Sequence, residues 1–250
     1  MRSSGVYFSE LGHRLKSVLS ARASWGVVLV LVAVQILVSV AGGHEALPWV
    51  FQNLGLSRQG ISEGKVWQLF TYGLLHGGLP HVAINSLCIV LIGARVEHVL
   101  GKGRVVKTLC AGILGGGVAH LMLDESGPLV GASGGCVAML ILLTTLSPES
   151  KMWPVPVSAR TLGIAVMFVE LVLALVDLKP EIPGFFKVVE MFTTVGLAGG
   201  EHSIGHACHF GGGVAGFITG IWLLRPRVTI ATLRRDRQRR EARKVKSGGV

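Results

Sequence analysis

ASWGVVLVLVAVQILVSVAGGH, residues 23–44, contains no Asp, Glu, Lys or Arg. Four more charge-free stretches follow at 68–94, 108–123, 126–148 and 202–224, and only Glu170 interrupts a sixth stretch at 161–176. A helix that spans a bilayer needs about 20 mostly apolar residues. The sequence therefore predicts an all-α, polytopic membrane protein with six spans, at residues 25–42, 80–100, 104–123, 130–147, 158–177 and 205–224.

The composition of the 250-residue chain excludes other broad classes. Half of the residues are apolar and 15% are charged, whereas about a quarter would be charged in a soluble domain. A disordered chain would be far less apolar. The net charge of +10 would by itself suggest nucleic-acid binding, so the position of the basic residues decides what that charge means.

Basic residues cluster in segments that alternate with the predicted spans. With the N-terminus in the cytoplasm, the inner segments 1–24, 95–107, 148–160 and 225–250 hold 20 of the 24 Lys and Arg residues. This asymmetry follows the positive-inside rule and predicts that both termini are cytoplasmic. We expect an N-terminal segment (1–24), a membrane domain (25–224) and a basic tail (225–250). Anionic lipid headgroups explain the tail, so no nucleic-acid partner is expected.

Polar residues within spans mark a function or a partner. The second span opens with His81 and Asn85, which share one helix face because they are four residues apart. The fourth span opens with Gly131-Ala-Ser133-Gly134, and the sixth contains His209. Since all three spans enter from outside in this topology, these polar groups are expected within about 10 Å of the outer surface, at similar depth.

Such a layer suits a serine hydrolase. Ser133 needs a base to accept its proton, and His209 is the natural candidate. A glycine stripe follows His209 and lets a neighbouring membrane helix come close. His81, Asn85 and the backbone N–H groups at the start of the Ser133 helix could stabilise an oxyanion.

These motifs resemble the rhomboid family of intramembrane serine proteases, from about Trp67 to Leu224. The resemblance rests on the His81-x3-Asn85 pattern, on Gly131-Ala-Ser133-Gly134 and on His209 with the glycines that follow it. It implies a six-helix rhomboid bundle whose active site opens to the outer side of a cell membrane. From the compact six-span plan we expect a bacterial cytoplasmic membrane. It also implies transmembrane protein substrates, contact with membrane lipids, no cofactor, no metal and no obligate partner.

The resemblance also implies a role for each matching residue. Ser133 matches the nucleophile and His209 the base, in a dyad without a third acid. His81, Asn85 and the Ser133 backbone N–H match the oxyanion hole. The matching supporting positions are the turn glycine Gly131, Gly134 beside the nucleophile, Glu97 as an acid that braces the loop region, and the loop residues Trp67 and His76.

Two positions depart from the family pattern. Gln68 stands where the family often has Arg, so an ion pair that anchors the loop is expected to be missing or replaced. Val137 stands where some members place a Tyr that stacks on the catalytic histidine, and His206 is the candidate replacement.

Several alternatives remain open from the residues alone. A catalytically silent relative would bind membrane helices, although such relatives usually lack the Ser or the His. Glu170 in mid-span is the only support for a transporter; otherwise it is a bundle-facing acid bonded to a neighbour. A metalloprotease helix would need Glu where Ser203 stands between His202 and His206. A metal site could also combine His206 and His209 with Cys208.

Overall fold

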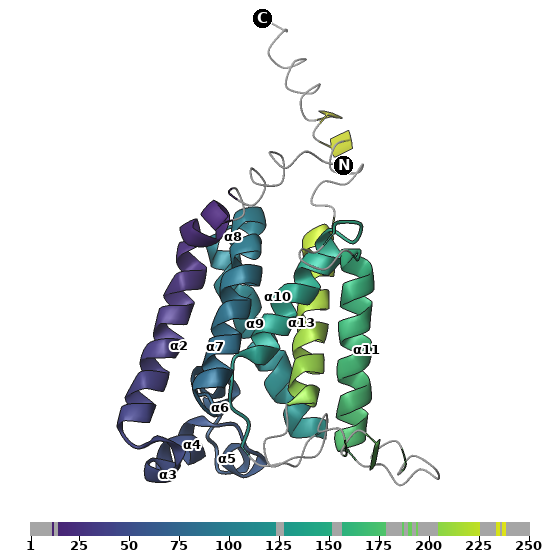
Figure 1. The fold of residues 1–250 in the computed structure, drawn as a ribbon. Coiled ribbons are helices and arrows are strands. Elements are labelled where there is room, and N and C mark those ends of the chain that lie inside the picture. Colours follow the sequence, from purple (N-terminus) through teal and green to yellow (C-terminus); the bar gives the residue numbers. More distant parts are fainter. Residues whose placement is uncertain are drawn as a thin grey trace, which may run out of the picture.

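The computed structural model describes residues 15–123, 128–151, 157–178 and 205–225, with isolated positions at 12, 187, 190, 191, 194, 234, 235, 237 and 238. In this part of the chain, five helices are long and apolar enough to cross a membrane (Figure 1). They are α2 (Arg22–Val40), the continuous helix Leu79–Leu100, α9 (Lys102–Leu123), α11 (Ala159–Asp177) and α13 (His206–Leu224). The helix Leu79–Leu100 consists of α7 (Leu79–Cys88), the π-helical turn η2 (Ile89–Gly93) and α8 (Ala94–Leu100).

The sixth expected span is a shorter helix, α10 (Ser133–Leu146), of 14 residues. Its length of about 21 Å is less than the thickness of a hydrocarbon core of about 30 Å. The preceding chain enters in extended form, because Leu129 and Leu56 exchange two backbone hydrogen bonds of 2.8 and 3.0 Å. The all-helical bundle is confirmed with five candidate spans, while the sixth span at 130–147 stays a prediction.

Three helices, α9, α10 and α13, form the centre of the bundle, and glycines set how close they come. A Cβ atom on Gly212 of α13 would collide with the Gly134 carbonyl oxygen of α10. A Cβ on Gly116 of α9 would lie 2.7 Å from the Cys208 carbonyl oxygen of α13. Backbones therefore touch directly, as small residues allow between membrane helices.

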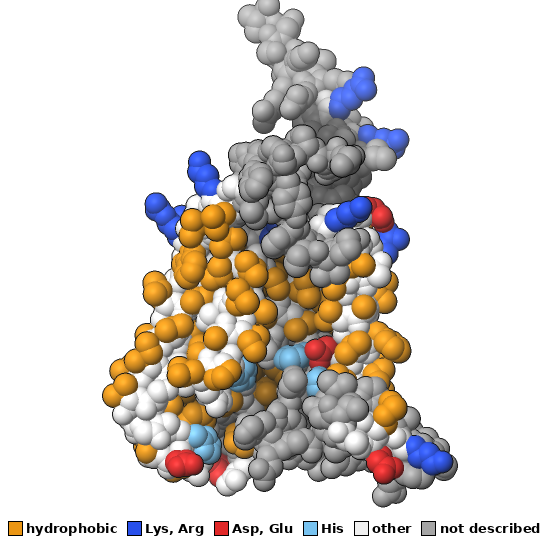
Figure 2. All heavy atoms as spheres, viewed as in Figure 1, with side chains coloured by type: hydrophobic (Ala, Val, Ile, Leu, Met, Phe, Trp, Pro, Cys, Tyr) orange, Lys and Arg blue, Asp and Glu red, His pale blue; other side chains and the backbone are white. Residues whose placement is uncertain are grey.

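Helix α2 lies at the periphery and buries only a narrow stripe, namely Ser24, Val28, Leu31 and Gln35. These positions recur every three to four residues, as expected for one helical face. The opposite face is apolar yet open, with Val40 83% exposed. Figure 2 shows such apolar side chains as a broad band on the face in view, with Lys and Arg gathered mainly at the end where α2 begins and α13 ends. An apolar exterior of this kind suits a lipid environment.

The segment between α2 and α7 folds back against the other end of the bundle (Figure 1). It contains α3 (Gly43–Ala46), α4 (Pro48–Leu54), α5 (Arg58–Ser62), α6 (Gln68–Thr71) and η1 (Tyr72–Leu74). Tyr72 is fully buried, donates a 2.5 Å hydrogen bond to the Ile113 carbonyl of α9 and lies 3.5 Å from Cys208 Sγ of α13. These contacts pack the segment on the bundle.

Candidate active site

His81 and Asn85 lie in α7, in the first half of the continuous helix Leu79–Leu100, one turn apart on the same face. Asn85 is buried, and its Nδ2 has no hydrogen-bond partner in the described structure. Its Oδ1 lies 3.8 Å from Cys136 Sγ of α10, which holds α7 against the start of that helix. A buried amide donor without an acceptor is costly, so this group is available to bind an oxygen of a ligand.

The turn before Ser133 is built around Gly131, whose φ of +119° is disfavoured for other L residues. Its N–H donates to the Tyr72 carbonyl at 3.0 Å. A Cβ at this position would lie 2.7 Å from His81 Nε2 and 3.6 Å from Asn85 Nδ2. The absence of a side chain therefore brings both α7 residues next to the segment that leads into Ser133, as the shared depth predicted.

Ser133 is the first residue of α10 and is partly exposed. The first hydrogen bonds of the helix are donated by Gly135 and Cys136 to the Ala132 carbonyl, at 3.0 and 3.2 Å. The N–H groups of Ser133 and Gly134 precede them and point toward this end. The next residue, Gly134, approaches α13 so closely that a Cβ would lie 2.9 Å from Cys208 Sγ. Because Cys208 directly precedes His209, the structure brings the first turns of α10 and α13 together.

His209 is in the first turn of α13, partly exposed, and close enough to His81 for the two rings to interact electrostatically. No hydrogen bond joins Ser133 to His209 in this structure. The His209 ring is instead hydrogen-bonded to Glu170. Catalytic hydrogen bonds are often long without substrate and shorten when it binds. The four residues expected in one layer thus lie on three helices that meet at one end of the bundle.

Glu170 of α11 supplies a group that the resemblance did not imply. Its Oε1 lies 3.0 Å from His209 Nδ1, and its Oε2 lies 2.8 Å from His206 Nδ1. The expectation that no third acid accompanies the histidine is wrong in geometry, because a carboxylate is hydrogen-bonded to its ring. The alternative of a bundle-facing acid bonded to a neighbour is confirmed for Glu170.

The same contacts bear on the metal alternatives. The ligand atoms of Glu170, His206 and His209 lie within 4.8 Å of one another, a spacing that could also hold a metal ion. Cys208, the expected third ligand, instead contacts Tyr72 through its Sγ. Of the His202–His206 pattern, His202 falls outside the described residues.

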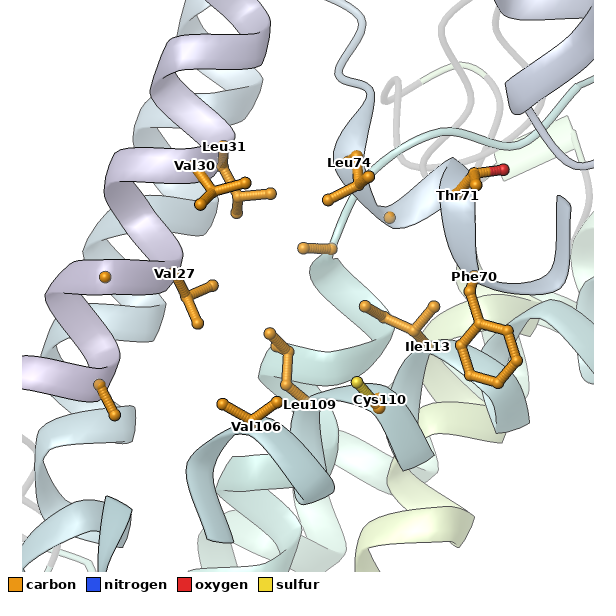
Figure 3. A pocket seen from close by; sticks show the side chains of 14 residues that line it. Val27, Val30, Leu31, Phe70, Thr71, Leu74, Val106, Leu109, Cys110 and Ile113 are labelled. Atoms are coloured by element: carbon orange, nitrogen blue, oxygen red, sulfur yellow. The ribbon is translucent and has the colours of Figure 1, made fainter. Parts of the chain in front are cut away.

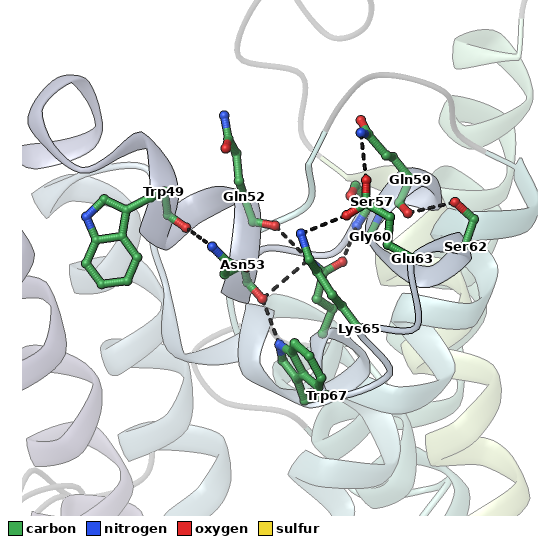
Figure 4. Close-up of polar contacts among 11 residues, drawn as sticks. Trp49, Gln52, Asn53, Ser57, Gln59, Gly60, Ser62, Glu63, Lys65 and Trp67 are labelled. Carbon is green, nitrogen blue, oxygen red and sulfur yellow. Dashed lines mark hydrogen bonds and ion pairs between the residues drawn. The ribbon is translucent and has the colours of Figure 1, made fainter.

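Trp67 and Gln68 anchor the loop segment, the part of the chain between α2 and α7. Figure 4 labels Trp67 and its neighbours Gln52, Asn53 and Ser57. Trp67 Nε1 donates to the Asn53 carbonyl at 2.8 Å. The fully buried Gln68 donates through Nε2 to the Gln52 and Asn53 carbonyls at 2.9 and 3.3 Å, and its Oε1 accepts from Ser57 N–H at 3.2 Å. The ion pair expected for an Arg is thus replaced by a neutral amide that satisfies three backbone groups.

His76 is buried next to His81. His76 is 2% exposed, and its ring meets His81 edge-on with centroids 5.0 Å apart. Burial lowers the pKa of His76 to about 4, and the neighbouring His81 acts in the same direction. His76 therefore packs as a neutral ring against His81, one of the residues expected in the oxyanion hole.

Glu97 does not brace the loop segment, which corrects that expectation. Its carboxylate accepts hydrogen bonds from the N–H groups of Ala23 and Ser24, at 3.0 and 3.2 Å for Oε2. These are the first N–H groups of α2, where a negative charge also complements the helix dipole. The reason is topological, since α8 ends beside the start of α2, at the opposite end from the loop (Figure 1).

An apolar cavity of about 490 Å³ lies between α2, η1 and α9 (Figure 3). Val27 and Leu31 of α2 face Leu109 and Ile113 of α9 across it. Its lining is apolar apart from Thr71 and the Cys110 thiol, and it includes Ala132, the residue before Ser133. None of the residues proposed for catalysis lines it.

The described fold and site define a multi-pass membrane protein with a Ser, His and Asn cluster between its helices. A family model described as Rhomboid domain matches residues 63–226, about two thirds of the chain. The chain belongs to the rhomboid family.

Three relatives illustrate the similarity. RHOMBOID-like protein 5 of Arabidopsis thaliana is 30% identical over 174 residues, 68% of this chain and 48% of that protein. Rhomboid protease GlpG of Klebsiella pneumoniae is 30% identical over 119 residues, 47% of this chain and 41% of that protein. Rhomboid-related protein 3 of Homo sapiens is 34% identical over 76 residues, 30% and 19% of the two chains. The chain spans less than half the length of each of these relatives.

Proposed function

We propose that this protein is an intramembrane serine endopeptidase that cleaves transmembrane segments of membrane-anchored proteins. Family membership supports protease chemistry at the level of the family. The observation that carries the proposal for this chain is the meeting of α7, α10 and α13 around Gly131 and Gly134, on either side of Ser133. Three unrelated segments contribute a hydroxyl, an imidazole and an unpartnered amide to one place.

In the proposed mechanism, Ser133 Oγ attacks the scissile carbonyl carbon while His209 accepts the hydroxyl proton. The negative oxygen that forms receives hydrogen bonds from Asn85 Nδ2, His81 and the N–H at the start of α10. His209 then gives the proton to the leaving amine, and the C–N bond breaks. Water, deprotonated by His209, hydrolyses the acyl-enzyme and restores Ser133.

The proposed orientation places both termini in the cytoplasm and the site near the outer face of a cell membrane, with six spans. Its support is the gathering of Lys and Arg at the end of the bundle where α2 begins and α13 ends (Figure 2), since cytoplasmic segments are enriched in these residues. The bacterial cytoplasmic membrane is the proposed location. Membrane lipids surround the apolar exterior, and transmembrane protein segments are the proposed substrates.

The proposal is tested by cleavage of a transmembrane reporter by purified variants in liposomes. Ser133→Ala and His209→Ala should each abolish cleavage and leave the melting curve intact, and a fluorophosphonate probe should label wild type on Ser133. Asn85→Ala should slow turnover by about 10²-fold, because other oxyanion donors remain. Ser86→Ala, the adjacent position on α7, is the matched control and should cleave normally.

A catalytically silent relative is the second candidate. It would bind the same reporter without cleaving it. Cleavage at the wild-type rate by Ser133→Ala would exclude Ser133 as the nucleophile, and binding without cleavage by wild type would favour the silent relative.

A further inference from the structure

Glu170 occupies an unusual position in the described structure. It lies in α11 among apolar neighbours, and its carboxylate contacts histidines of another helix through both of its oxygens. The side chains of Glu170, His206 and His209 are 16%, 5% and 15% exposed, so water solvates them little. An acid at such depth is costly unless it is paired or functional.

The contacts of Glu170 determine which nitrogen of His209 carries a proton. An ionised carboxylate only accepts hydrogen bonds, so an imidazole nitrogen that faces it must carry the hydrogen. His209 faces Glu170 with Nδ1. Its Nε2 then holds the lone pair, which is the form that can take a proton from a serine hydroxyl.

His206 fixes the carboxylate in turn. Because Oε2 is held by His206 and Oε1 by His209, rotation of the Glu170 carboxylate would break both hydrogen bonds. Among the described residues, His209 makes a ring contact with His206, edge-on with centroids 6.1 Å apart, and no stacked ring contact of His209 is found there. The hydrogen bond from α11 is therefore the contact that sets both the orientation and the tautomer of its ring.

We propose that Glu170 is a positioning residue that holds His209 with the proton on Nδ1 and the lone pair on Nε2, with His206 fixing the carboxylate. This inference rests on the proposed function for its catalytic consequence, while the tautomer itself does not depend on activity. During the reaction Glu170 stays ionised and stabilises the imidazolium that forms when His209 takes the Ser133 proton.

Other ionisable groups lie on the elements packed against α13 and enter any pH dependence. His206 lies one turn away on α13, and His81 approaches from α7. Cys136 lies in the first turn of α10, beside Ser133. On α9, His120 follows Ala119, which packs on Gly211 of α13. Glu170 is the acid in direct contact with His209, so its removal is a specific perturbation.

The first experiment reads the tautomer directly, in full-length protein whose histidines carry the NMR-active nitrogen isotope. The His209 signals are assigned by their loss in His209→Ala. We expect a protonated Nδ1 and an unprotonated Nε2 in wild type, and loss of that preference in Glu170→Gln. Protonation of Nε2 in wild type, or an unchanged spectrum in Glu170→Gln, would overturn the proposal even if the protein proved to have no protease activity.

The second experiment measures kinetics on the transmembrane reporter. Glu170→Gln should lower kcat by about 10²-fold with little change in KM, because the amide no longer fixes the required tautomer. The acid limb of the pH profile should also move to lower pH, a readout that a merely structural contact would not change. Glu170→Asp should recover part of kcat.

Glu149→Gln is the matched control, because Glu149 also pairs with a basic side chain, Arg160, but lies exposed at the helix end. It should retain wild-type kinetics. A normal kcat in Glu170→Gln would overturn the positioning role. Loss of wild-type activity on treatment with a chelator, restored by Zn²⁺, would also overturn it, because the three side chains would then act as metal ligands. If wild type neither cleaved nor bound the fluorophosphonate, only the proposed function would fall, since the tautomer measurement stands apart.

Discussion

The contact between α10 and α13 and the boundary of α2 with the rest of the bundle differ sharply in packing. At the first contact, backbones touch, so that a Cβ on Gly212 would collide with Gly134 and one on Gly216 with Ala138. At the second, a Cβ on Gly26 would meet nothing within 4 Å, beside an apolar cavity of about 490 Å³. Figure 3 shows how far the side chains of α2 stand from those of α9 there.

The difference in packing shows which helices hold their side chains in fixed positions. The residues proposed for catalysis stand on the closely packed helices, and a displacement of about 1 Å in a reacting group can cost 10²-fold in rate. Helix α2 is joined to the bundle chiefly through the Glu97 carboxylate at its first turn and a narrow buried stripe. The same kind of substitution should therefore have opposite effects in the two regions.

The largest effect is expected where the close contact is broken. Gly212→Ala places a methyl group against the Gly134 carbonyl, which as backbone cannot move aside cheaply. Overpacking of this kind costs typically about 1–3 kcal/mol and occasionally more, and we expect about 3 kcal/mol here. Thermal unfolding in detergent should show a lower melting temperature, and reporter cleavage should fall at least about tenfold because Ser133 and His209 move apart.

A Gly212→Ala protein with wild-type melting and cleavage would mean that α10 and α13 are not in backbone contact. Gly103→Ala is the control, because a Cβ there meets nothing within 4 Å. It should melt and cleave as wild type does.

A smaller effect is expected in the loop segment, which closes the end of the bundle that carries the site. Gln68→Ala leaves the Ser57 N–H and the Gln52 carbonyl without this partner, while the Asn53 carbonyl keeps its hydrogen bond from Trp67. Because each buried group left unpaired costs about 1–3 kcal/mol, and some will find water, we expect about 2–3 kcal/mol of destabilisation. Chemical unfolding curves measure it.

The control for Gln68 is Gln59→Ala. Gln59 bonds only the exposed Glu63 through its side chain. A surface change of this kind is expected to shift stability by less than about 0.5 kcal/mol. Equal effects of the two variants would show that Gln68 does not anchor the loop.

Acid should lower the free energy of unfolding through His76, which lies at the end of the loop segment. The unfolded histidine takes up a proton near pH 6.5, whereas burial lowers the pKa of folded His76 to about 4. Between these values the unfolded state binds more protons, so stability falls as pH falls from 6.5 toward 4 and is constant above. The loss should reach about 2.5 kcal/mol by pH 4.5.

The measurement compares unfolding at pH 7.5 and pH 4.5 for wild type and His76→Gln. The variant should lose less stability than wild type on acidification. An identical pH dependence in the two proteins would exclude His76 as the responsible group.

The sequence predicts the four polar residues of the site better than it predicts the contacts that position the helices carrying them. His81, Asn85, Ser133 and His209 are visible because polar residues are rare in spans and these four share a depth. The length of the charge-free stretches locates the spans, but it places the start of the fourth span too early, at residue 130. The segment before α10 is extended and pairs through Leu129, yet it is as apolar as a helical segment, so composition does not distinguish the two. The partner of Glu97 depends on which helix ends meet in space, and no spacing along the chain gives that.

Glu170 is the clearest case of a missed signal. It lies seven residues before the end of α11, and His209 lies three residues after the start of α13. At 1.5 Å per residue these are comparable depths from one end of the bundle, about 10 and 5 Å. The same depth comparison that joined the other four residues would therefore have added this acid. Its choice of His206 and His209 as partners still requires the packing of α11 on α13.

The smallest effect is expected at the α2 boundary, and its sign is opposite. Gly26→Ala adds a methyl group where a Cβ meets nothing within 4 Å, at the edge of the apolar cavity. Replacing a glycine in a helix interior by alanine gains about 0.5–1 kcal/mol, since the unfolded chain loses freedom. The melting temperature should therefore rise slightly, with reporter cleavage unchanged. A fall in stability comparable to that of Gly212→Ala would mean that α2 packs as closely as α13 does, and the contrast between the two regions would not hold.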